Sequence, residues 1–138
     1  MTSTLLYRVA AIVFVLFAVG HTIGFLSLRP ASAEGRAVLD SMNSVRFEVR
    51  GRSYSYGDFY RGFGLSCTVS MLLSAFLSWH LGQLARSTPS AVGFMGWAFF
   101  LLQLPGIALS FLYFGPPPMV LSAMVALLLG CAAWLVGR

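Results

Sequence analysis

The feature that most constrains this chain is the length of its charge-free segments. Residues 9–28, 62–85 and 87–137 contain no aspartate, glutamate, lysine or arginine. A charged side chain at the centre of a bilayer costs a few kcal/mol or more, and about 20 helical residues cross the hydrocarbon core. Only 9% of all residues are charged, whereas a soluble domain is about 25% charged. The chain is therefore predicted to be an integral membrane protein.

A proline-rich break divides the last of these segments. Gly115 is followed by Pro116, Pro117 and Pro118, and three consecutive residues without amide hydrogens cannot lie inside a helix. The prediction is an all-α membrane protein, a single domain over residues 1–138 built as a four-helix transmembrane bundle. Its helices are expected near residues 5–28, 59–85, 91–114 and 119–137, with a cap over residues 29–58.

The long connection between the first two spans is predicted to contain a short amphipathic helix over residues 36–50. Val38, Met42, Val45 and Val49 recur at helical spacing, with charged and polar residues between them. Such a helix would lie at the membrane surface or over the mouth of the bundle. Aromatic residues typical of a membrane interface follow at the start of the second span: Tyr54, Tyr56, Phe59, Tyr60 and Phe63.

Five polar residues are expected to share one leaflet and form a candidate pocket: His21, Asp58, Tyr60, Arg61 and Gln103. In one interpretation His21 or Asp58 exchanges protons, and Tyr60 or Arg61 stabilises an oxyanion. In the second, His21 bonds across the bundle, Asp58 caps its helix and Arg61 reaches lipid phosphates, while Gln103 satisfies a carbonyl freed by the following proline. A contact surface for another membrane subunit is the third.

Small residues predict where helices approach one another. Close packing is expected at four glycines, namely Gly20, Gly24, Gly62 and Gly64. This packing favours a tight bundle and permits a homo-oligomer. Cys67 and Cys131 are too isolated for a disulfide framework and are predicted to be small buried hydrophobes.

The distribution of ionisable residues excludes several classes of protein. The nine arginines are separated by long neutral segments, so no basic face for nucleic acid forms. All four acids lie between residues 34 and 58, which excludes a small multidrug transporter with a carboxylate inside the membrane. His21 and His80 would stand roughly 20–25 Å apart along the helices and cannot clamp one haem. No metal site is predicted, and no cofactor is required, although a pigment or haem on one histidine stays open.

Two arginine counts disagree about orientation. Arg8, Arg86 and Arg138 share the side of the termini, and the other six arginines lie with the acids on the opposite side. The third and fourth spans form a hairpin whose open end carries arginines and whose proline turn carries none, which favours cytoplasmic termini. The first segment is longer than the apolar part of a signal peptide and is expected to be retained.

The chain resembles a family of small, uncharacterised bacterial four-helix integral membrane proteins. The stretches that carry the resemblance are His21-Thr22-Ile23-Gly24, Met42 and Tyr56-Gly57-Asp58-Phe59-Tyr60-Arg61-Gly62-Phe63-Gly64-Leu65. In helix number and size the architecture is also similar to that of DoxX-like proteins. The resemblance covers the first two spans and the cap, and it implies a location in the bacterial inner membrane but no activity.

Two classes of function follow. The first is an accessory or assembly subunit of a larger inner-membrane complex. It is favoured by the small apolar bundle and by the lack of a catalytic pair of nucleophile and base. An enzyme is therefore the less favoured expectation. The second is a small membrane enzyme or binding protein for a lipophilic ligand, using the His21, Asp58, Tyr60 and Arg61 pocket. Expected partners are membrane lipids and a membrane protein or a second copy of the chain, with no nucleic acid and no assigned catalytic residue.

Overall fold

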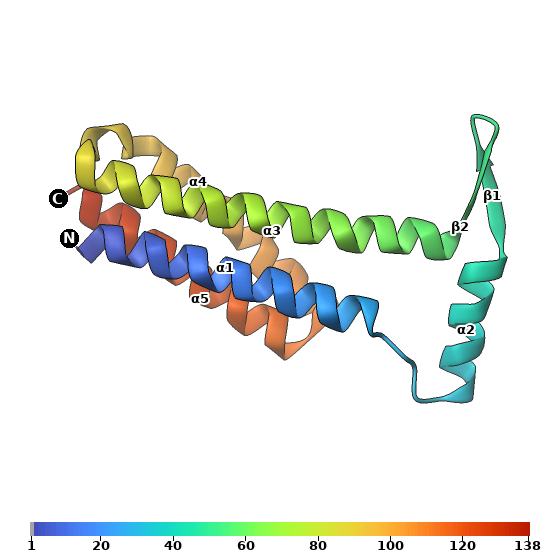
Figure 1. Cartoon of the computed structure of the whole chain (residues 1–138). Coiled ribbons are helices and arrows are strands. Elements are labelled where there is room, and N and C mark those ends of the chain that lie inside the picture. The colour runs from blue at the N-terminus through green and yellow to red at the C-terminus, as the bar shows by residue number, and fades with distance from the viewer. Residues whose placement is uncertain (1) are drawn as a thin grey trace. The chain divides into compact units, whose positions relative to one another are not determined.

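The computed structural model describes residues 2–138, which are helical apart from one short hairpin and its connections (Figure 1). The elements in chain order are α1 (Thr2–Leu26), α2 (Ala33–Ser44), β1 (Arg46–Val49), β2 (Arg52–Ser55), α3 (Tyr56–Ser87), the 3-10 turn η1 (Pro89–Ala91), α4 (Gly93–Leu109), the π-helical turn η2 (Ser110–Phe114) and α5 (Pro116–Val136).

Four segments are long and apolar enough to cross a membrane: Thr2–Leu26, Tyr56–Ser87, Gly93–Phe114 and Pro116–Val136. They confirm the prediction of an all-α membrane protein with four candidate spans, and their ends lie within a few residues of the predicted ones. The arrangement of all four as one bundle stays a prediction.

The described contacts divide the chain into two compact units. The core unit combines residues up to Phe17 with Met71–Arg138, and the cap unit is Ala18–Ser70. Helices α1 and α3 contribute to both units.

The core unit is packed through small residues and a few large ones. Its buried hydrophobic cluster contains Tyr7, Ala10, Val13, Phe14, Ala75, Leu81, Ala85, Val92, Phe99, Val125, Leu129 and Ala132. Glycines allow the close approach, because a Cβ built on Gly82 would meet the Thr4 carbonyl oxygen at 3.3 Å and one on Gly130 would meet the Phe100 ring at 3.1 Å. Small residues at helix contacts are the usual means of packing in a membrane.

The connection between α4 and α5 shows how the three prolines are accommodated. At the end of η2 the Gly115 amide donates to the Ser110 carbonyl at 3.1 Å, and Gly115 has φ +80, a conformation that glycine adopts at little cost. Helix α5 then begins at Pro116. The prolines therefore occupy the first helical turn, where an amide hydrogen would have no partner within the helix.

The predicted helix over 36–50 is wrong in its second half. The N-cap of helix α2 is Ser32, whose hydroxyl accepts a hydrogen bond from the Gly35 amide at 3.0 Å. The helix ends at Ser44. Val38 and Met42 lie on this helix. Residues 46–49 instead form strand β1, which pairs in antiparallel register with β2.

The hairpin forms because the residues after Ser44 favour an extended backbone. Val45 and Val49 are β-branched and Phe47 is aromatic, the types enriched in strands. Arg50 and Gly51 both have positive φ, 51° and 76°, as a two-residue turn of type I′ requires. The four apolar residues of the predicted stripe therefore do not share one helix.

Both cysteines, predicted to be buried, are exposed on the surface of the chain. Large apolar side chains on the spans are exposed as well, for example Phe94 at 82%. A membrane span does not need to bury such side chains in protein, because lipid tails are as apolar as a protein core. The sequence rule that places apolar cysteines inside a protein therefore fails here.

Candidate functional site

His21 connects the second half of α1 to the first half of α3. Its Nε2 lies 3.1 Å from the Gly64 carbonyl oxygen, and since a carbonyl only accepts, this nitrogen carries the hydrogen. The ring stacks on Phe25 with centroids 5.7 Å apart, and Phe25 packs on Tyr60 at 5.0 Å. A Cβ on Gly64 would overlap the Phe25 ring. The histidine thus forms a polar link between two helices.

Two threonines extend this link by one turn and were not singled out from the sequence. The Thr22 hydroxyl donates to the Ala18 carbonyl at 2.7 Å and lies 2.8 Å from the Thr68 hydroxyl. Their only sequence signal is that Thr22 follows His21 and that Thr68 lies one turn after Gly64. The rotation of the two helices, which the sequence does not specify, brings them together.

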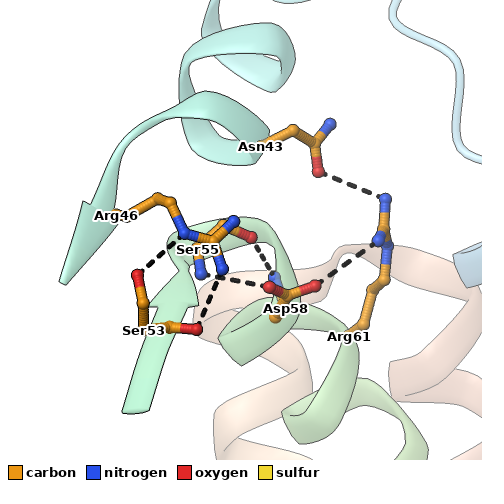
Figure 2. A network of polar contacts seen from close by, with 6 residues as sticks. All are labelled: Asn43, Arg46, Ser53, Ser55, Asp58 and Arg61. Atoms are coloured by element: carbon orange, nitrogen blue, oxygen red, sulfur yellow. Dashed lines mark hydrogen bonds and ion pairs between the residues drawn. The ribbon is translucent and has the colours of Figure 1, made fainter. Parts of the chain in front are cut away.

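Asp58 and Ser55 form a reciprocal cap at the start of α3 (Figure 2). The Asp58 amide donates to the Ser55 hydroxyl at 2.9 Å, and the Ser55 amide donates to Asp58 Oδ2 at 3.0 Å. This is the capping-box pattern, in which two otherwise unpaired amides are satisfied together. It explains why α3 begins at Tyr56, before the predicted residue 59.

Arg61 joins this cap to α2. Its Nη2 donates to Asn43 Oδ1 at 3.2 Å, and its Nη1 lies 3.8 Å from Asp58 Oδ1. Arg46 binds Ser53 across the hairpin, from Nε to the hydroxyl at 2.8 Å and from Nη2 to the carbonyl at 2.9 Å. Figure 2 shows that these contacts connect α2, both strands and α3 in one network. The Arg61 and Asp58 side chains are both about half exposed, so their attraction is largely screened.

Gln103 belongs to the core unit. Its side-chain amide donates to the Phe99 carbonyl at 3.2 Å, one turn back on α4. The carbonyl that lacks a helical donor because of Pro105 is that of Leu101, so the predicted role of Gln103 is wrong. Within the cap unit, His21 is linked to Tyr60 through Phe25, and Asp58 pairs with Arg61. A pocket shared by all five residues stays a prediction.

The four glycines predicted to pack helices differ in their surroundings. Gly64 lies under the Phe25 ring, whereas a Cβ on Gly20, Gly24 or Gly62 would meet no atom within 4 Å. Within the cap unit, no described side chain therefore packs closely at these three positions. They stay candidates for contact with another chain.

An aromatic groove lies beside the cap. Its volume is about 560 Å³, and its lining residues are Phe47, Val49, Tyr54, Asp58, Phe59, Gly62, Phe63 and Ser66. Phe47 lies 5.0 Å from Tyr56 and 6.2 Å from Phe59 between ring centroids. Of the predicted polar residues only Asp58 lines the groove. Phe47 was missed because the sequence analysis placed it on a helix.

This arrangement supplies packing and hydrogen bonds rather than an obvious reaction centre. Within residues 2–138 no three His, Cys, Asp or Glu side chains are grouped as metal ligands. His21, Asp58 and Arg61 each bond to another part of the same unit. Comparison of the chain with protein-family models, curated proteins and solved structures finds no match.

Proposed function

We propose that the chain is an accessory or assembly subunit of a larger membrane complex and that its cap, residues 29–58, with the adjoining start of α3, contacts the partner. The observation that supports this proposal is the use of the candidate polar residues in contacts that order the cap. Ser55, Asp58 and Arg61 hold the hairpin, α2 and α3 to one another. An ordered surface loses less conformational entropy when a partner binds.

The surface that this network holds is rich in exposed aromatic side chains. Tyr56, Phe59 and Phe63 are 50%, 57% and 62% exposed. Tyr56 and Phe59 contact the Phe47 ring, and Phe63 contacts Phe59. Aromatic residues dominate the energetics of protein interfaces. The partner is proposed to be an integral membrane protein or a second copy of this chain.

We further propose a location in the bacterial inner membrane with both termini in the cytoplasm. The four candidate spans support insertion, and an even number of spans places both termini on one side. The resemblance to small bacterial four-helix membrane proteins supports the inner membrane.

A lipophilic ligand in the groove is the second candidate function. The groove of about 560 Å³ is mainly aromatic and has one carboxylate, Asp58, on its lining. A hydrophobic pocket with few polar groups is the usual form of a small-molecule site. In this alternative the ligand lies on Phe47, Phe59 and Phe63 and directs a polar group to Asp58.

A site-specific photo-crosslinker at Phe59 in native membranes tests both candidates. The matched control is the same probe at Phe94, which is 82% exposed and belongs to the core unit. A defined protein adduct at 59 that is absent at 94 supports the subunit proposal. A small-molecule adduct at 59 supports the ligand alternative. Lipid adducts alone at both positions contradict both.

Substitution of the polar residues supplies a second test. For a subunit, His21→Ala and Arg61→Ala are expected to lower the stability of the protein or weaken its retention in the complex. For a ligand in the groove, whose lining includes Phe63 but neither His21 nor Arg61, Phe63→Ala would accumulate normally and lose the ligand during gentle purification. Mass spectrometry of the purified material distinguishes these outcomes.

A further inference from the structure

A second cavity lies in the core unit, where the start of α1 meets the end of α3. Its volume is about 440 Å³, and it is lined by Thr4, Leu5, Arg8, Ala85 and Arg86. We propose that this cavity binds a phosphate group, carried by the headgroup of an anionic phospholipid or by free phosphate. This inference is independent of the partner or ligand proposed for the cap.

The charge of the core unit favours an anion. The unit contains Arg8, Arg86 and Arg138 but no aspartate or glutamate, because all four acids lie between residues 34 and 58. Two guanidinium groups therefore line one cavity without a carboxylate side chain from their own unit. An anion in the cavity would offset the positive charge of these two residues, and arginine is the residue best suited to phosphate oxygens.

An unpartnered buried hydroxyl on the lining supplies a second, independent indication. Thr4 is 8% exposed, and its Oγ1 has no hydrogen-bond partner in the described chain. The Nε of Arg8 is also buried and unpartnered. Such groups are destabilising unless an acceptor satisfies them. Both residues line the cavity, so a rotation of either side chain would present its unpartnered group to a phosphate oxygen.

The position of Arg8 is suited to this role. Its guanidinium carbon lies 5.1 Å from the centre of the Trp79 ring, so the flat face of the group is held by the indole. The N–H donors of a guanidinium lie in its plane, so a contact over the indole face does not use them.

The surroundings suggest how a lipid would fit. Leu5, on the lining, is 61% exposed, so an apolar surface adjoins the two arginines and the hydroxyl. A phospholipid could place its phosphate in the cavity and an acyl chain along Leu5. Free phosphate would use the same donors without that apolar contact.

The test uses the full chain in vesicles that contain phosphatidylglycerol and phosphatidylcholine, followed by native mass spectrometry. Wild type is expected to retain phosphatidylglycerol. The affinity of Arg86→Gln for this lipid is expected to be lower by a factor of about five or more, the effect of losing a charged hydrogen bond. Thr4→Val is expected to lose retention and Thr4→Ser to keep it. The control is Arg138→Gln, because Arg138 stacks on Trp134 at 4.8 Å but does not line the cavity.

Inorganic phosphate added to delipidated protein in detergent separates the two sources. Broadening of the phosphorus resonance by wild type, lost in Arg86→Gln, identifies a site that takes phosphate itself. Retention of phosphatidylglycerol without such broadening identifies a lipid site. Equal loss of retention in Arg138→Gln and Arg86→Gln would overturn the proposal in favour of general surface charge. Unchanged binding of both ligands in Thr4→Val and Arg86→Gln, with thermal unfolding confirming a folded chain, would overturn it as well.

Discussion

Replacing Ser55 with alanine is expected to loosen the first turn of α3 by about 1 kcal/mol, the typical effect of removing a serine N-cap. The substitution removes the acceptor of the Asp58 amide, a bond of 2.9 Å, while the backbone amide of residue 55 can still donate to Asp58. Ser55 is only 3% exposed, so water replaces the lost bond poorly. The effect should therefore not lie at the low end of the range of about 0.5–2 kcal/mol measured for such caps.

Amide hydrogen exchange over residues 57–61 in mild detergent measures this change. A loss of about 1 kcal/mol corresponds to roughly fivefold faster exchange through local opening. Ser66→Ala is the matched control, because Ser66 is an exposed serine of the same helix whose hydroxyl only donates to the Gly62 carbonyl. The double variant Ser55→Ala/Asp58→Ala should accelerate exchange by less than the sum of the two single-variant effects. Both substitutions break the same capping motif, so their effects are not additive. Equal exchange in Ser55→Ala and wild type, or equal acceleration in Ser66→Ala, would refute the capping argument.

The remaining predictions concern packing and topology. Gly64→Ala should destabilise the chain by about 1–3 kcal/mol through overpacking, because its Cβ would overlap an aromatic ring. The control Gly62→Ala places its Cβ in open space and should change the temperature of thermal unfolding little. Tyr7→Phe removes a buried hydroxyl without a partner, so the melting temperature should stay equal or rise, and a clear fall would contradict this reasoning. In a cysteine-free background, Ser41→Cys and Pro117→Cys should react with an impermeant maleimide from the same side of the membrane, and labelling from opposite sides would contradict four spans.

The spans could be predicted because membrane insertion depends on local properties of the sequence. Charge-free length and the proline run at 116–118 are both visible without knowledge of any contact. The prolines mark the helix boundary for the reason expected, the missing amide hydrogens. The exact starts and ends differ by a few residues. Helix α3 begins at Tyr56 because Ser55 and Asp58 form a capping box.

The hairpin could not be separated from a helix by periodicity alone. Val38, Met42, Val45 and Val49 have helical spacing, but Val45, Phe47 and Val49 also alternate as a strand requires. The turn at Arg50 and Gly51 decides between the two patterns. A two-residue turn at this position requires a strand on each side, so the helix ends earlier, at Ser44.

Part of the candidate site could be predicted because its signals are local in the sequence. The spacing of Ser55 and Asp58 is a local capping signal, and Arg61 follows Asp58 by one turn of the helix. The contact of His21 with the Gly64 carbonyl depends on how two helices are rotated about their axes. No local pattern specifies that rotation, so the partner of His21 could only come from the structure.

The contacts of the arginines bear on the orientation of the protein. In the cap unit Arg36 donates to the Ala31 carbonyl at 2.7 Å, Arg46 binds Ser53, and Arg61 lies beside Asp58. These side chains are held by neighbours, and the acids of the chain lie in the same unit. The three arginines of the core unit have no acidic side chain in their unit. The positive-inside rule counts arginines in loops of up to about 60 residues and so applies to the cap arginines as well. The α4 and α5 hairpin favours the opposite orientation, because Arg86 and Arg138 flank its open end and its proline turn carries no charge. This difference supports the proposed cytoplasmic termini although the cap contains more arginines.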